Sequence, residues 1–163
     1  MQAIPPAAKA AGILAQKLMK TVTLLLFAGL LLLSTQVFAN LLTVEDAYVR
    51  ATPPNSKNSA AFMVIKNTSK KEVKLIATGS DIADRVELHT HLHVDGMMKM
   101  RQVDNVIIKA ESSVSLQPGG YHVMFLNVKQ PLKEGQSIAL LLYFNNGEQI
   151  KINVPIKKIN VYK

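Results

Sequence analysis

The segment SIALLLYFNNGEQIKINVPI, residues 137–156, consists of two apolar runs separated by Asn145-Asn146-Gly147-Glu148. An Asn-Gly pair between two such runs is the strongest short-range signal for a β-hairpin, because both central residues of a type I′ turn require a positive φ. The segment therefore predicts two antiparallel strands joined by a type I′ turn.

Similar short runs occur throughout the chain upstream of this hairpin, and helical periodicity is hard to find after residue 40. Turn residues separate the runs, notably at 53–55, 95–96 and 118–120. The runs are DAYVR (46–50), AAFMVIKN (60–67), EVKLIATG (72–79), DRVELHTHL (84–92), MMKMRQV (97–103), VIIKA (106–110), SVSLQ (113–117) and YHVMFLNV (121–128). Many short strands separated by turns are typical of an antiparallel sandwich or barrel, so we expect an all-β single domain.

Residues 1–39 have the pattern of a secretory signal peptide. They carry three lysines and no acidic residue, an apolar run from Leu24 to Leu33, and a small-x-small pattern that ends at Ala39. Met19 is a possible true start, because the segment from there to Ala39 is a complete signal by itself. The apolar run is shorter than the roughly 20 residues that span a bilayer. We therefore expect a periplasmic domain, residues 40–163, that does not span the membrane.

The charge of this predicted mature domain is mild. Once the three lysines of the signal are removed, 16 basic and 11 acidic residues leave a net charge of about +5. The lysines are dispersed and are not interleaved with aromatic residues, so nucleic-acid binding is not expected. The chain has no cysteine, which excludes disulfides and thiolate metal ligands.

The stretch HTHLHVDGMMKM, residues 89–100, contains three of the four histidines and three of the seven methionines of the chain. Alternate residues of a strand share a face, so His89, His91 and His93 are expected to point the same way.

A two-residue turn at Asp95-Gly96 would place methionines opposite these histidines. His93 would then face Met98 and His91 would face Met100, with His89 one diagonal away. Opposed side chains have Cβ atoms about 5 Å apart, which is close enough to share one ion.

A second pair, His122 and Met124, has the same i, i+2 spacing on a later predicted strand. Thioether sulfur is soft and neutral, and together with imidazole it suits Cu(I) better than Zn(II), Mg(II) or Ca(II). The two remaining methionines of interest, Met63 and Met97, are expected to be core residues.

The spacing of four of these residues is more specific than their composition. His89, Met100, His122 and Met124 form the pattern His-x10-Met-x21-His-x-Met. This pattern resembles the motif of the periplasmic copper chaperone family PCu(A)C. The blocks AYVRATPP, AAFMVIKN, VELHTH, MMKMRQV, LQPGGYHVMF and PLKEGQSIALLLYF are similar to that family's blocks in its order, and the resemblance covers residues 43–155.

The resemblance implies a cupredoxin-like Greek-key β-sandwich or barrel that binds one Cu(I) through His89, Met100, His122 and Met124. It implies a monomeric carrier that delivers copper to cytochrome c oxidase, alone or with a Sco-type thioredoxin-fold protein. Strand geometry alone leaves His91 as an alternative to His89, because His91 is the residue expected opposite Met100.

His91, His93 and Met98 lie beside the motif as possible additional metal ligands. The two extra histidines could form a second, harder site for Cu(II), or an entry path for the metal. Three other functions are consistent with parts of the sequence. The first is periplasmic copper buffering or resistance. The second is a cupin-type metalloenzyme, which His89-Thr90-His91 resembles, although the glutamate that follows the cupin histidines is absent. The third is a β-sandwich adhesin or subunit-binding module in which the cluster is incidental packing.

Overall fold

The computed structural model describes residues 19–20, 41–94 and 96–158. The predicted signal peptide, apart from Met19 and Lys20, and its cleavage point lie outside these residues, as does Asp95. The described residues from 41 to 158 form one compact unit. Within the described part of the chain, no helix is long and apolar enough to span a bilayer.

The described chain forms ten strands, and each overlaps a segment predicted from the sequence, although the first begins at Leu42, before the predicted start at 46. They are β1 (Leu42–Arg50), β2 (Ser59–Asn67), β3 (Val73–Gly79), β4 (Ala83–Val94), β5 (Met97–Gln102), β6 (Val106–Ile108), β7 (Ser112–Leu116), β8 (His122–Val128), β9 (Ser137–Phe144) and β10 (Gln149–Lys157).

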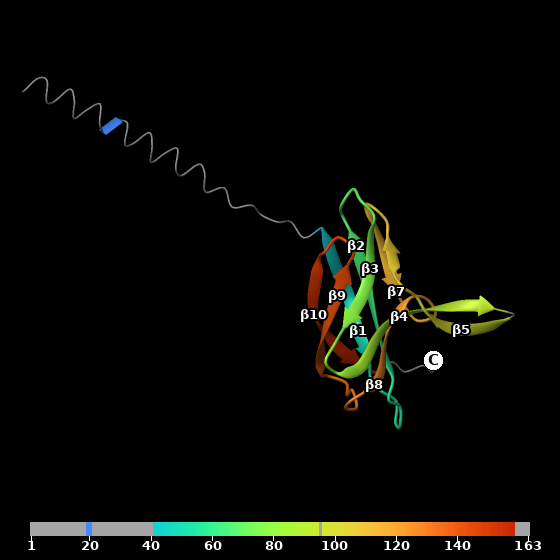
Figure 1. The fold of residues 1–163 in the computed structure, drawn as a ribbon. Helices are drawn as coiled ribbons and strands as arrows, with labels where there is room; N and C mark the ends of the chain where they lie inside the picture. Colours follow the sequence, from blue (N-terminus) through green and yellow to red (C-terminus); the bar gives the residue numbers. More distant parts are fainter. Residues whose placement is uncertain (1–18, 21–40, 95, 159–163) are drawn as a thin grey trace, which may run out of the picture. The chain divides into compact units, whose positions relative to one another are not determined.

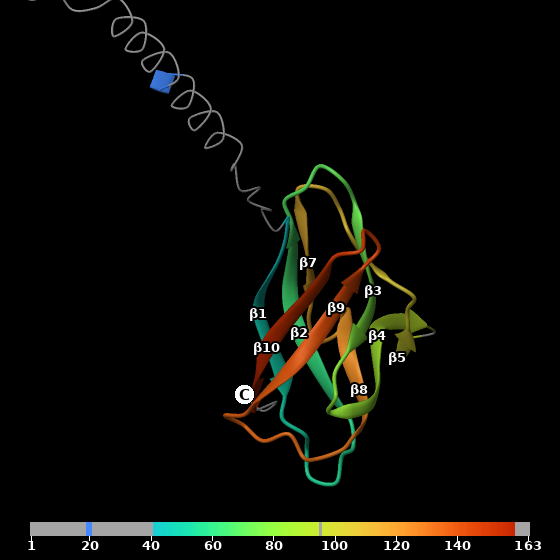
Figure 2. The same cartoon turned by 60° about the vertical axis from the view of Figure 1, so that its left-hand side comes forward.

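The strands are hydrogen-bonded in the order β5-β4-β8-β2-β1-β10-β9-β3-β6, and β7 pairs with β2. The β1–β10 pair is parallel, and the other described pairs are antiparallel. In Figures 1 and 2 the sheet turns back on itself, so that β3, β9 and β10 face β1, β2 and β8. The expected all-β sandwich is confirmed.

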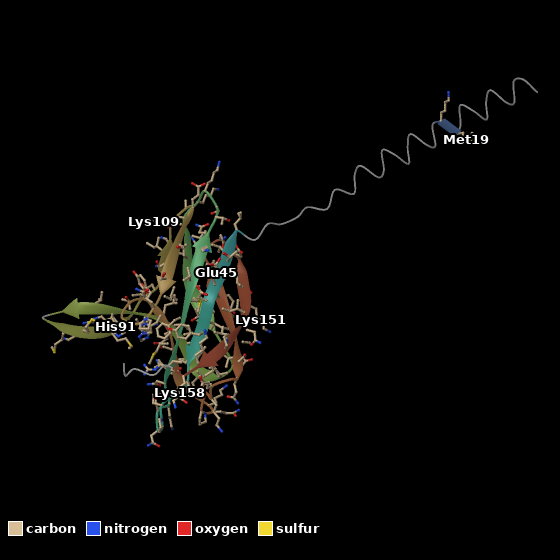
Figure 3. The ribbon with its side chains drawn as sticks, turned by 180° about the vertical axis from the view of Figure 1, so that it is seen from behind. Met19, Glu45, His91, Lys109, Lys151 and Lys158 are labelled. Atoms are coloured by element: carbon tan, nitrogen blue, oxygen red, sulfur yellow. The ribbon has the colours of Figure 1, made fainter. Side chains whose placement is uncertain are left out.

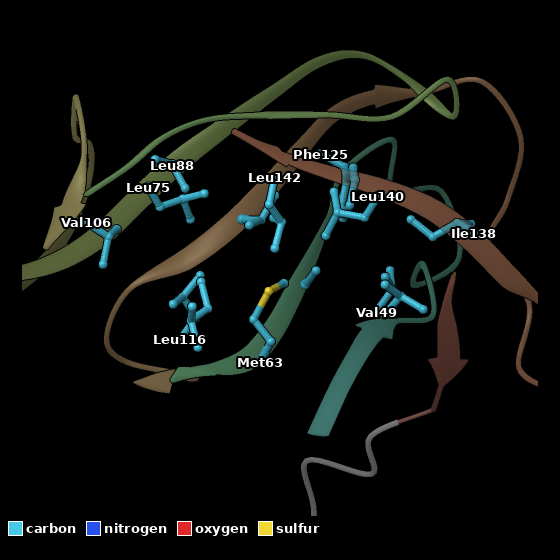
Figure 4. Close-up of a cluster of buried hydrophobic side chains, with 14 of the residues drawn as sticks. Val49, Met63, Leu75, Leu88, Val106, Leu116, Phe125, Ile138, Leu140 and Leu142 are labelled. Carbon is cyan, nitrogen blue, oxygen red and sulfur yellow. The ribbon is translucent and has the colours of Figure 1, made fainter. Parts of the chain in front are cut away.

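The core lies between these two layers (Figure 4). Alternate residues of β9 point inward, so Leu140 and Leu142 are fully buried, and Phe125 of β8 meets them from the other layer. Burial of each such side chain contributes about 1.5–3 kcal/mol. Met63 is 2% exposed, so its predicted place in the core is confirmed.

The β9–β10 hairpin is confirmed, but its turn is not type I′. Gly147 has a positive φ of 85°, whereas Asn146 is not among the residues with positive φ. The N–H of Gly147 donates to the carbonyl of Phe144 at 3.1 Å, which closes a three-residue loop with glycine in the left-handed region. Asn145 ties this loop to β3, because its side-chain oxygen accepts a hydrogen bond from the N–H of Lys74 at 2.8 Å.

The β4–β5 hairpin extends away from the two layers (Figure 1). Val94 pairs with Met97, which is the register of the predicted two-residue turn, and Gly96 has a φ of 74°. The prediction that Met97 is a core residue is wrong, since it is 57% exposed. The hairpin leaves the sandwich before Met97, so no opposite layer covers it there.

Candidate metal centre

Three neighbouring strands, β5, β4 and β8, bring the predicted ligands together. His89 is directly opposite His122 in the β4–β8 pairing, and His91 is directly opposite Met100 in the β4–β5 pairing. Met124 lies two residues after His122 on β8, opposite Glu87. Because alternate strand residues share a face, one face of the sheet carries His89, His91, His122, Met100 and Met124.

His122 is the most buried of these residues, with 2% of its surface exposed. Its Nδ1 lies 3.0 Å from the carbonyl oxygen of Gly120. Since a carbonyl can only accept, Nδ1 carries the proton and Nε2 carries the lone pair. Nε2 is buried and has no hydrogen-bond partner.

Burial lowers the pKa of His122 below its usual value. The hydrogen bond to Gly120 raises this pKa, and the neighbouring His91 and His89 lower it further when charged. The imidazole is therefore neutral around pH 7, in the state that binds a metal ion.

His89 has a similar arrangement with its two ring nitrogens exchanged. Its Nε2 lies 2.8 Å from a carboxylate oxygen of Glu87, and Arg85 pairs with the other oxygen at 3.1 Å. The Nδ1 of His89 is buried without a partner. Metal-binding histidines characteristically donate their second ring N–H to a carboxylate or a carbonyl, as His89 and His122 both do here.

His91 is placed differently from the other two histidines. Its ring centroid lies 5.1 Å from that of His122, compared with 5.9 Å for His89. Neither ring nitrogen of His91 makes a hydrogen bond to any described residue, and its Nδ1 is buried. Figure 3 shows His91 on the β4–β5 hairpin.

An open hollow of about 370 Å³ lies against this cluster. His91, Met100, His122 and Met124 line it, whereas His89 does not. The remaining walls come from the chain around the β1–β2 connection and from the turn before β8: Arg50, Ala51, Pro53, Ser56, Asn58, Ser59, Ala60, Phe62, Pro118 and Gly119.

The structure says less in favour of the other two possible ligands, Met98 and His93. Met98 is 55% exposed, and its backbone pairs with that of His93. The side chain of His93 is outside the described residues. Among the described residues, no group of three or more His, Cys, Asp or Glu side chains is arranged to hold a metal ion, so a site at this place draws on the methionines.

Sequence reasoning missed Glu87, Arg85 and Gly120. The i, i+2 alternation that grouped the histidines also places Arg85 and Glu87 on the same face of β4. That alternation was the available signal for the Glu87–His89 pair. The hydrogen bond of His122 to Gly120 depends on the path of the turn before β8 and had no such signal.

The fold and the cluster define a β-sandwich protein whose clustered imidazole and thioether groups are the donor types of a soft metal site. The family model described as "Putative lipoprotein LpqE-like" matches residues 42–156. The chain belongs to this family, which is the PCuAC family expected from the motif.

Among curated proteins, the chain is 33% identical over 115 residues to "Putative lipoprotein Lxx21020" of Leifsonia xyli subsp. xyli, covering 70% of this chain and 68% of that protein. Among solved structures, it is similar to the Cu(I) form of DR1885 from Deinococcus radiodurans, with 31% identity, a TM-score of 0.62, and coverage of 76% of this chain and 81% of that one. The apo PCuAC domain of PmoF1 shares the fold at 23% identity and a TM-score of 0.63, covering 73% and 95% of the two chains. The expected cupredoxin-like fold is thereby confirmed.

Proposed function

We propose that this protein is a copper chaperone that carries one Cu(I) on His89, Met100, His122 and Met124. The observation that carries the proposal is the pairing of His89 and His122 across β4 and β8. Each ring donates one N–H to an acceptor and keeps its other nitrogen buried and unpartnered. An unpartnered buried nitrogen costs free energy of about 1–3 kcal/mol, which coordination of a metal ion would offset.

The donor set supports a carrier rather than an enzyme. Two imidazoles and two thioethers satisfy Cu(I) and leave no open position for a substrate. Met100 is 46% exposed, so an acceptor can reach one ligand directly and exchange ligands one at a time. The structure of DR1885 in its Cu(I) form supports the same oxidation state.

The compartment and acceptor are part of the proposal. We place the protein in the cell envelope, in the periplasm, on the strength of the signal-like residues 1–39 and of the lipoprotein description of the relative from Leifsonia xyli. The family resemblance supports delivery to cytochrome c oxidase, with a Sco-type protein as a partner. Copper buffering or resistance is the alternative use of the same site.

Two experiments test these points. Protein isolated from copper-supplemented periplasm should contain about one copper per chain, since the site offers one set of four donors. Iron or manganese in its place would indicate a cupin-type enzyme, and no metal would indicate an interaction module. Deletion of the gene should lower cytochrome c oxidase activity at limiting copper. Normal oxidase activity with greater copper sensitivity would indicate buffering instead.

A further inference from the structure

We propose that His91 is the exchangeable ligand of this copper site: Cu(I) enters and leaves through His91 at the hollow, while His89 retains the ion inside. This inference rests on the proposed function, since it assumes that Cu(I) is carried at the cluster. It gives His91 a role at the same ion in place of the separate Cu(II) site considered from the sequence.

The orientation of the His89 ring is restrained by its neighbours. Its side chain is 14% exposed, and the Glu87 carboxylate that accepts its N–H is 15% exposed. Arg85 holds the second oxygen of that carboxylate at 3.1 Å. This charge-assisted hydrogen bond fixes the ring orientation and leaves Nδ1 on the buried side.

His91 lacks the hydrogen bond that holds His89. Neither of its ring nitrogens is hydrogen-bonded within the described chain, so the ring can turn without breaking a bond. It lines the hollow with Met100, His122 and Met124, which His89 does not. Met100, directly opposite His91, is 46% exposed. The imidazole of His91 and the exposed thioether of Met100 are therefore neighbours at the open side of the cluster.

His122 is the ligand that both positions share. Its ring lies close to both of the others, with centroid distances of 5.9 Å to His89 and 5.1 Å to His91. An ion bound to Nε2 of His122 can therefore exchange one imidazole for the other without leaving His122. In this exchange one Cu–N bond forms and another breaks, copper remains Cu(I), and no electron or proton is transferred.

The hollow gives an acceptor access to the exchangeable side. Its volume of about 370 Å³ admits a ligand side chain, and Arg50 lines its wall. A guanidinium close to an incoming thiol lowers that thiol's pKa and favours the thiolate, which is the form that binds copper. The chemistry thus fits an acceptor that offers a cysteine thiolate.

The test compares His91→Ala and His89→Ala, with Thr90→Ala as the matched control on the opposite face of the same strand. Cu(I) affinity is measured anaerobically by competition with bathocuproine disulfonate. The rate of transfer is measured by stopped flow, with the same chelator and with a dithiol peptide as acceptors. We expect His91→Ala to slow transfer at least about tenfold while losing less affinity than His89→Ala, whose loss should reach at least about tenfold.

Three outcomes would overturn the proposal. Equal loss of affinity in the two variants would make His91 a permanent ligand. An unchanged transfer rate in His91→Ala would make it a bystander. A second copper equivalent in the wild type that disappears in His91→Ala would establish a separate site. Absence of Cu(I) binding by the wild type is a different result, because it would overturn the proposed function itself.

Discussion

The Nδ1–H of His122 donates to the carbonyl of Gly120 at 3.0 Å, and this single bond commits the opposite nitrogen, Nε2, to the buried interior of the cluster. A neutral imidazole has one donor and one acceptor nitrogen, so the bond selects the tautomer. Gly120 thereby holds His122 in the tautomer that the proposed copper site requires.

The same burial makes the stability of the metal-free protein depend on pH. Because burial lowers the pKa of His122 in the folded state, the unfolded chain takes up a proton first as the pH falls below about 6.5. Above that pH, His122 does not make the free energy of unfolding depend on pH. Below it, the free energy of unfolding falls as the pH falls, until the folded-state pKa of His122 is reached. One proton gives a slope of at most about 1.4 kcal/mol per pH unit.

Urea unfolding between pH 7.5 and pH 5 measures this slope for the wild type and for His122→Gln. The variant lacks the titrating group, so its free energy of unfolding should fall less steeply over this interval. Parallel curves for the two proteins would show that His122 titrates in the folded state as it does in the unfolded chain.

Glu87→Gln tests the anchor of His89. The amide retains the shape of the side chain but removes the charge that accepts the N–H of His89 and pairs with Arg85. Loss of such a partner lowers metal affinity about 10–100-fold, which a Cu(I) competition titration measures. The exposed Glu72→Gln is the control. Wild-type affinity in Glu87→Gln would show that His89 needs no anchor, and recovery in Glu87→Asp would confirm a positioning role.

Phe125→Ala tests the core. Phe125 is fully buried between the two layers, so the variant should lose about 3–5 kcal/mol of unfolding free energy in denaturant titration. Ile107→Ala removes an apolar side chain that is 47% exposed and should change stability by less than about 1 kcal/mol. Similar losses in the two variants would contradict the assignment of the core.

Asn67→Ala tests a buried hydrogen-bond cluster at the end of β2. Its side-chain amide donates to the carbonyls of Lys71, Ile108 and Lys109 at 2.7, 3.2 and 3.1 Å. Alanine leaves these carbonyls without that donor, so we expect a loss of about 1–3 kcal/mol in the same unfolding assay. The exposed Asn153→Ala should leave stability nearly unchanged. An unaltered midpoint for Asn67→Ala would mean that water replaces the amide.

Local sequence patterns predicted the structural features that depend on residues close together in the chain. The strands, the register of His91 with Met100 and the burial of Met63 all follow from period-two alternation and short turns. The prediction that Met97 is a core residue was wrong because its exposure depends on where the hairpin leaves the sandwich, which no local pattern encodes.

Contacts between distant segments account for the other differences. The loop at Asn145-Asn146-Gly147 is tied to another strand by the bond of Asn145 to Lys74. In the same way, the choice between His89 and His91 depends on Glu87 and on the walls of the hollow, which come from three separate parts of the chain. Sequence spacing identified the cluster of donors but not the different environments of its histidines.

The most direct test of the account is an anaerobic Cu(I) titration of the wild type, Met100→Leu and Met124→Leu against a chromophoric competitor. Leucine conserves volume and removes the thioether sulfur, so the fold should survive while the soft ligand is lost. We predict binding of about one equivalent by the wild type and a loss of affinity of at least about tenfold in each variant. Unchanged affinity in both variants would contradict a copper site built from these methionines.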